Sequence, residues 1–230
     1  MNILITDDDV ELCDLLKEYL EHEGLQVSLC HDGQSAIEKI NETQFDLLIL
    51  DVMMPKKNGF ETLTEIRKNS LLPVIMLTAK GDKIDRIVGL EMGADDYVAK
   101  PCDPREIVAR IRAVTRRNVS TAASLKINGS DALVQEDLIL NRNNRQVTVS
   151  NKNIELTSTE FDFLIALLEN AGSLVTREKL SSDILGKRLQ SFDRSIDMHI
   201  SHLRKKLGLR KDGQERIKTL RGNGYQYLVD

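Results

Sequence analysis

FDLLILD, residues 45–51, is an apolar run that ends on a carboxylate, and it is the clearest indication of the fold in this sequence. Three further apolar runs end on polar residues in the same way: NILITDD on Asp7 and Asp8, PVIMLT on Thr78, and DYVAKP before its proline on Lys100. Runs of this length that are rich in Ile, Leu and Val are typical of strands buried on both faces. Segments with helical periodicity lie between them, and the first half of the chain reads as five βα units. The sequence therefore predicts an α/β domain with a five-stranded, doubly wound parallel sheet.

The polar residues at these strand ends form a candidate site. Ligands of such sheets bind just beyond the carboxyl ends of the strands, so three carboxylates, a hydroxyl and an ammonium should meet in one crevice. Two carboxylates about 4 Å apart repel each other by roughly 4 kcal/mol at an effective dielectric constant near 20. The cluster therefore needs a proton or a cation, and an all-oxygen anionic site favours Mg²⁺ over Zn²⁺. Asp51 is then placed to attack a phosphoryl group whose oxygens contact Thr78 and Lys100. The alternative is that these residues are ordinary loop carboxylates and a helix cap.

Charge divides the chain unevenly. The 230 residues carry a net charge of −4. Residues 1–120 hold 15 basic and 22 acidic residues, which gives −7, and residues 121–230 hold 17 and 14, which gives +3. Between positions 187 and 221 there are 11 basic and 4 acidic residues, or +7. This asymmetry favours an acidic signalling half and a nucleic-acid-binding half, although a basic run is often only a solvated face.

The second half has a different pattern of elements. Short β-like runs (DALV, DLILN, RQVTV and NIEL) precede a helix that starts at a capping box formed by Thr157 and Glu160. Further helices are expected from about 176 to 184 and from about 193 to 207, followed by two β-like runs around Gly222-Asn223-Gly224. Three helices followed by a basic hairpin indicate a winged helix, whose helix fits the major groove of DNA and whose hairpin fits the minor groove.

Residues 1–117 resemble the receiver domain of two-component response regulators. Asp7-Asp8, Asp51, Thr78 and Lys100-Pro101 match the acidic pair, phospho-acceptor, switch threonine and Lys-Pro pair of that family. The resemblance implies that Tyr97 is an aromatic switch residue, that the Met53 carbonyl helps Asp7, Asp8 and Asp51 to bind Mg²⁺, and that the Lys-Pro peptide is cis. It also implies self-directed phosphoryl transfer to and from Asp51, and no other enzyme activity.

The remainder of the chain resembles the winged-helix module of the OmpR/PhoB subfamily. Within it, KKNG, LGKRL, FDRSIDMHIS and KTLRGNGY are closest to regulators of envelope stress. The resemblance implies domains at 1–117 (receiver), 118–130 (linker) and 131–230 (DNA-binding). It places Arg194, His199, Ser201, His202 and Arg204 of the recognition helix, and Thr219, Arg221 and Tyr225 of the wing, against DNA.

The same resemblance implies partners. A sensor histidine kinase would phosphorylate Asp51, and the phosphorylated chain would form a homodimer through Arg86 with Glu106 and Asp96 with Arg110. Such a dimer would bind double-stranded DNA at direct-repeat promoter sites, with RNA polymerase as a further candidate partner. The alternative for the dimer residues is exposed pairs worth about 0–1 kcal/mol each.

Three cysteines without C-x-x-C spacing, and the lack of a signal peptide or a spanning apolar run, predict a reduced cytoplasmic setting without membrane attachment. Two other functional classes remain open: a constitutive DNA-binding repressor whose receiver half only dimerises, and a Mg²⁺-dependent phosphohydrolase. The hydrolase would need a cap domain and a second acid two residues after Asp51, where this chain has Met53.

Overall fold

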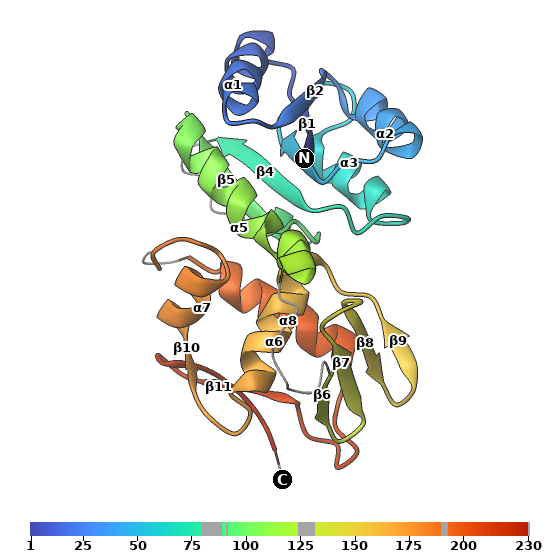
Figure 1. Ribbon diagram of the computed structural model, residues 1–230, viewed down its shortest axis with the longest axis vertical. Helices are drawn as coiled ribbons and strands as arrows, with labels where there is room; N and C mark the ends of the chain where they lie inside the picture. Colours follow the sequence, from blue (N-terminus) through green and yellow to red (C-terminus); the bar gives the residue numbers. More distant parts are fainter. Residues whose placement is uncertain (80–88, 91, 124–131, 190–192, 230) are drawn as a thin grey trace. The chain divides into compact units, whose positions relative to one another are not determined.

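The computed structural model describes residues 1–79, 89–90, 92–123, 132–189 and 193–229, with the backbone alone for residues 79 and 116–123. The chain divides into two compact units, Met1–Arg116 and Arg117–Asp230 (Figure 1).

The first unit is a parallel sheet between two layers of helices. Its strands are β1 (Asn2–Thr6), β2 (Gln26–Cys30), β3 (Leu47–Asp51), β4 (Val74–Ala79) and β5 (Asp96–Lys100), in the order β2-β1-β3-β4-β5 with every pairing parallel. Helices α1 (Val10–His22) and α5 (Pro104–Ala123) cover one face, and α2 (Gly33–Glu42) and α3 (Gly59–Ile66) cover the other (Figure 1). The predicted doubly wound sheet is therefore confirmed. The segment between β4 and β5, which contains Arg86, lies mostly outside the described residues.

The central strand β3 shows how the apolar runs of the sequence determine the sheet. All five of its residues are buried. Leu16 and Leu20 of α1 and Ile107 and Ile111 of α5 belong to one buried cluster with alternate strand residues. Helix starts are fixed locally as well, since side chains of Asp9, Asp32 and Asn58 accept backbone N–H groups at the first turns of α1, α2 and α3. The apolar runs and caps of the sequence thus hold the strand ends in place.

The second unit begins with an antiparallel sheet and continues as a helical module with a hairpin. The sheet consists of β6 (Ala132–Gln135), β7 (Leu138–Asn141), β8 (Gln146–Val149) and β9 (Lys152–Ile154). Then follow α6 (Ser158–Glu169), β10 (Val175–Thr176), α7 (Arg177–Asp183), α8 (Ser195–Leu207), β11 (Ile217–Leu220) and β12 (Gly224–Tyr227). The predicted three helices and basic hairpin are confirmed. The two-residue strand β10, which completes a sheet in the order β10-β12-β11, was not predicted.

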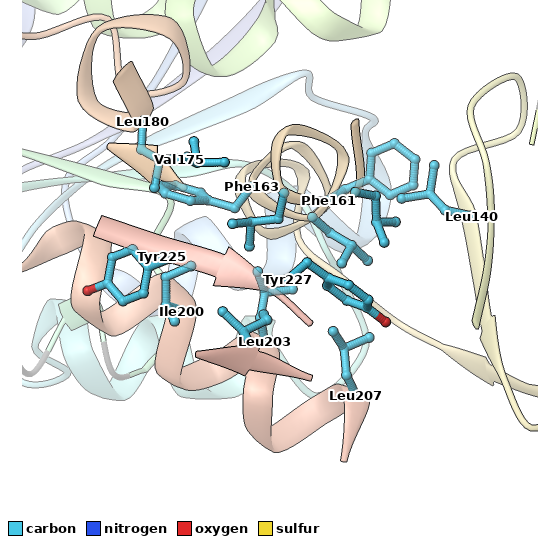
Figure 2. Close-up of a cluster of buried hydrophobic side chains, with 14 of the residues drawn as sticks. Leu140, Phe161, Phe163, Val175, Leu180, Ile200, Leu203, Leu207, Tyr225 and Tyr227 are labelled. Atoms are coloured by element: carbon cyan, nitrogen blue, oxygen red, sulfur yellow. The ribbon is translucent and has the colours of Figure 1, made fainter. Parts of the chain in front are cut away.

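One buried cluster joins these elements. Phe161 and Phe163 of α6, Ile200 and Leu203 of α8, and Tyr227 of β12 all belong to it (Figure 2). The capping box at the start of α6 is present as predicted. A shared core of this kind fixes α8 and the hairpin on one framework.

Two element boundaries differ from the sequence analysis. Helix α5 continues to Ala123, whereas a linker was expected from residue 118; the segment from 118 to 123 contains neither Pro nor Gly, so nothing in it stops a helix. Helix α8 begins at Ser195, two residues later than expected, and the Asp193 side chain accepts the Ser195 N–H at 2.9 Å. In the described part of the chain, no helix has the length and apolar character to cross a membrane.

Candidate functional site

The predicted acidic pocket exists at the carboxyl ends of the strands. Asp7 and Asp8 follow β1, and Asp51 ends β3. One carboxylate oxygen of each residue lies within 4.8 Å of the other two. Asp7 and Asp51 are buried, whereas Asp8 is exposed, so the pocket opens to solvent on one side.

Lys100, at the end of β5, contacts both buried carboxylates. Its Nζ lies 2.6 Å from Oδ2 of Asp7 and 2.6 Å from Oδ1 of Asp51. Burial raises the pKa of Asp7, and contact with Lys100 only partly offsets that effect. Burial lowers the pKa of Lys100, but hydrogen bonds to Asp51 and Asp7 outweigh it, so the pKa is raised. The ammonium therefore stays charged and provides part of the positive charge that this pocket needs.

Backbone groups orient the carboxylates further. The Met53 N–H donates to Oδ2 of Asp51 at 2.7 Å, and the Asp9 N–H donates to Oδ1 of Asp7 at 3.0 Å. Thr78 is buried on the neighbouring strand β4, and its hydroxyl has no hydrogen-bond partner within the described structure. A buried hydroxyl of this kind is available to a ligand oxygen.

The donor set fits Mg²⁺. Asp7, Asp8 and Asp51 offer hard carboxylate oxygens at one end of the sheet, which is the ligand type this ion prefers. Tyr97 is buried in β5, and the Lys100–Pro101 peptide is cis, as the resemblance implied.

Gly59 is a residue of this site that the sequence analysis missed. A Cβ at this position would lie 2.1 Å from the backbone oxygen of Asp51. The Gly59 N–H donates to the Val52 oxygen at 2.9 Å, so the first residue of α3 packs directly against the end of β3. The signal was a Gly just after the Asn58 cap, in a loop that must return to the strand carrying Asp51.

The second candidate surface is the exposed side of α8. Its buried side consists of Ser195, Ile196, His199, Ile200, Leu203 and Leu207. Arg194, Ser201 and Lys205 are exposed and follow a spacing of seven and four residues, so they share the opposite face. Lys205 was not among the predicted contacts, although its spacing from Ser201 would have indicated it. Arg221, Thr219 and Lys218 are exposed on the β11–β12 hairpin.

Four of the predicted DNA-contact residues contact other residues of the same chain. His199 is buried and stacks on Phe163, with ring centroids 5.2 Å apart. Tyr225 is buried, and its hydroxyl bonds Asp197. Arg204 donates to the Ile217 oxygen at 2.9 and 2.7 Å and to the Thr219 hydroxyl at 2.8 Å. His202 lies 3.5 Å from Glu160 through Nδ1. Their packing against the core accounts for the burial of His199 and Tyr225, and a role for either residue at DNA stays a prediction.

Lys206, a candidate phosphate contact by its charge, also has a partner in the protein. Its Nζ lies 2.7 Å from Oε2 of the buried Glu160. Burial opposes the ionisation of Glu160, but His202, Lys206 and Thr157 outweigh it and lower the pKa of this carboxyl to about 2.

The predicted dimer residues pair within one chain where they are described. Arg110 lies 3.4 Å from Asp96 and 2.9 Å from Glu106, through different guanidinium nitrogens. Asp96 is buried and Glu106 is about half exposed. Arg86 lies outside the described residues.

Comparison with known proteins identifies a family for each of the two units. Residues 3–112 match the response regulator receiver domain, and residues 151–227 match the C-terminal domain of transcriptional regulatory proteins. The chain belongs to the OmpR/PhoB family of two-component response regulators.

Within that family, the chain is 52% identical to the transcriptional regulatory protein CpxR of Escherichia coli K12, over 97% of this chain and 96% of CpxR. It is 48% identical to the CpxR homolog of Haemophilus influenzae, over 99% of both chains. Among solved structures, the response regulator DrrB of Thermotoga maritima, an OmpR/PhoB homolog, has a TM-score of 0.52 at 30% identity and covers 99% of this chain and 98% of its own.

Proposed function

We propose that Asp51 accepts a phosphoryl group from a sensor histidine kinase and that this modification controls DNA binding by the second unit. The observation that carries the proposal is the contact of Lys100 with two buried carboxylates at the end of the sheet. A buried carboxylate held by one ammonium and one backbone N–H is an oriented nucleophile.

In the proposed step, a carboxylate oxygen of Asp51 attacks phosphorus. A new P–O bond forms as the P–N bond of a phosphohistidine breaks, and the histidine nitrogen keeps the bonding electrons. Lys100 contacts a phosphoryl oxygen, and the Thr78 hydroxyl donates to another. Asp7, Asp8, Asp51 and the Met53 carbonyl would hold Mg²⁺, which when bound neutralises negative charge on the carboxylates and the phosphoryl oxygens.

The change from the unphosphorylated to the phosphorylated conformation would follow when the Thr78 hydroxyl donates to the phosphoryl group. Its movement toward the phosphoryl group changes packing near β4 and β5, where Tyr97 is buried. Moving a two-state equilibrium from 1:99 to 99:1 takes about 5.5 kcal/mol of differential stabilisation. Phosphorylation would in this way favour a homodimer through Arg86, Asp96, Glu106 and Arg110.

For DNA binding, the exposed face of α8 would enter the major groove and the β11–β12 hairpin the adjacent minor groove. Arg194, Ser201 and Lys205 would face the bases and phosphates from the helix, and Arg221 from the hairpin. A two-fold receiver dimer would bring two such modules onto direct-repeat promoter sites, where RNA polymerase is a candidate partner. The likeness to the transcriptional regulatory protein CpxR supports control of transcription. The sequence resemblance to regulators of envelope stress extends the proposal to that response, in the cytoplasm.

The proposal is tested by intact-mass measurement of the chain after incubation with acetyl phosphate and Mg²⁺. We expect a mass increase of one phosphoryl group in the wild type, and none in Asp51→Asn or after chelation of Mg²⁺. Asp46→Asn, which changes an exposed carboxylate at the start of the same segment, serves as the control and should be labelled normally. Equal labelling of wild type and Asp51→Asn would show that the acceptor lies elsewhere.

A further inference from the structure

Arg177, the first residue of α7, connects three parts of the DNA-binding module. Its Nη1 lies 2.6 Å from Oδ1 of Asp197, and its Nη2 lies 2.9 Å from Oδ2, so the ion pair is bidentate. Nη1 also lies 3.1 Å from the hydroxyl of Tyr225, which itself donates to Asp197. The backbone N–H of Arg177 donates to the oxygen of Asn223, in the hairpin turn, at 3.1 Å.

The three side chains come from elements that would have to act together on DNA. Asp197 lies in the first turn of α8, next to the exposed face that carries Arg194 and Ser201. Tyr225 lies in β12, with its ring in the buried cluster (Figure 2). Strand β10, which directly precedes Arg177, pairs with β12 through Val175 and Tyr225. Loss of any one of the three side chains would therefore remove contacts that connect α7, α8 and the hairpin.

We propose that Arg177, Asp197 and Tyr225 form a positioning clamp, which fixes α8 against the β11–β12 hairpin so that both reach their grooves at once. This inference rests on the DNA-binding surface proposed above. Bidentate pairing of a guanidinium with a carboxylate restricts angle as well as distance, which a single charge–charge contact does not. The Tyr225 hydroxyl adds a third fixed direction to the same carboxylate.

The charge of Asp197 makes the clamp testable. A carboxylate beside a surface that binds phosphates opposes DNA binding electrostatically. Because Asp197 lies in the first turn of α8, its negative charge also interacts favourably with the helix dipole. That interaction requires neither Arg177 nor Tyr225. If Asp197 acts only through its charge, Asp197→Asn should bind all DNA at least as tightly as the wild type. If Asp197 belongs to a clamp, the same change should weaken binding to the preferred sequence.

The experiment uses the full chain and two duplexes. One duplex is recovered by selection with the wild-type chain from a random library, and the other is an unrelated sequence of equal length. Affinities are measured for wild type, Asp197→Asn, Tyr225→Phe and the control Glu178→Gln. Glu178 is exposed in the first turn of α7, next to Arg177, so the control removes an equivalent negative charge outside the clamp. Thermal unfolding of each variant is followed in parallel.

For Asp197→Asn and Tyr225→Phe we expect about a tenfold loss of affinity for the selected duplex and little or no loss for the unrelated one, at temperatures where both variants are folded. Tyr225→Phe leaves the net charge unchanged, so a change in net charge cannot explain its effect. Glu178→Gln should keep the wild-type ratio of the two affinities. If Asp197→Asn and Tyr225→Phe also keep the wild-type ratio, the clamp is excluded, whereas the proposed DNA-binding surface is not. Failure of the wild type to enrich any sequence would instead overturn the surface, and the clamp with it.

Discussion

Lys100 Nζ lies 2.6 Å from Oδ1 of Asp51, so a charged ammonium directly contacts the carboxylate that we propose as the phosphoryl acceptor. The same nitrogen lies 2.6 Å from Asp7. Lys100 thus has two roles that follow from one geometry. It balances the charge of the buried carboxylates, and in the proposed phosphorylated state it would contact a phosphoryl oxygen.

Replacement of Lys100 by Met should destabilise the first unit. The substitution leaves two buried carboxylates without their common partner, which costs about 3 kcal/mol in the free energy of unfolding. Addition of Mg²⁺ should recover more than half of the loss, because the ion restores positive charge between the same oxygens. Urea denaturation, monitored by hydrogen exchange of the β3 amides with and without Mg²⁺, measures both effects. Lys68→Met, at an exposed pair with Glu65, should cost no more than about 1 kcal/mol and show no response to the ion.

Acidification should weaken the second unit through Glu160. Its pKa is about 2 in the folded chain and 4.5 ordinarily, so its ionised form contributes stability that is fully present above pH 4.5. That contribution, roughly 3 kcal/mol, is lost as the pH falls from about 4.5 toward 2. Glu160→Gln should therefore be much less stable than the wild type at pH 7, and the difference should shrink by pH 3. Hydrogen exchange of the α6 amides tests this, with Glu169→Gln, at an exposed ion pair, as the control. A stability difference that does not change with pH would contradict the assignment.

Arg204 and Lys205 should behave differently although they are adjacent cations. Arg204 holds β11 through the Ile217 oxygen and the Thr219 hydroxyl, so Arg204→Ala should lower stability by about 1–2 kcal/mol and weaken binding to all sequences. The selected DNA motif should keep its base preferences. Lys205 is exposed, so Lys205→Ala should leave stability unchanged and reduce the slope of log affinity against log salt by about 0.9 if it contacts one phosphate. Loss of preference at a single base position in Arg204→Ala would restore the base-reading role that its position in the sequence suggested.

The dimer is best tested at Glu106. Arg110 already pairs with the buried Asp96 in its own chain, so Arg110→Glu would damage the monomer as well as the interface. Glu106 is about half exposed, and Glu106→Lys should weaken the dimer formed with a beryllofluoride phosphate mimic. If Arg86 is its partner across the interface, Arg86→Glu in the same chain should restore the dimer. Light scattering of the single and double variants with the mimic measures this, and a double variant no better than Glu106→Lys would exclude the pairing.

The strand ends show how far the sequence could predict this protein. Buried parallel strands produce continuous apolar runs, and the residue that ends each run must lie at one edge of the sheet. The sequence alone was therefore enough to predict that Asp7, Asp51 and Lys100 lie close together. The capping box of Thr157 and Glu160 was equally local, since its two members are three residues apart.

The features that the sequence could not predict are tertiary contacts. A helical period separates the faces of α8 but does not tell which polar side chain finds a partner on another element. For this reason the contacts of Arg204 with β11, of His199 with Phe163 and of Tyr225 with Asp197 were not predicted. Strand β10 was missed because two residues carry no periodicity, and its position depends on Gly224, where a Cβ would lie 2.1 Å from the Val175 oxygen.

In the function proposed above, the state of Asp51 controls DNA binding by the second unit. The most direct measurement is the affinity of the full chain for its selected duplex, with and without beryllofluoride and Mg²⁺, in wild type and Asp51→Asn. We predict that the mimic tightens binding by the wild type at least tenfold and has no effect on Asp51→Asn. Equal affinity of the wild type in both conditions would contradict the account and would favour a receiver half that does not respond to phosphate.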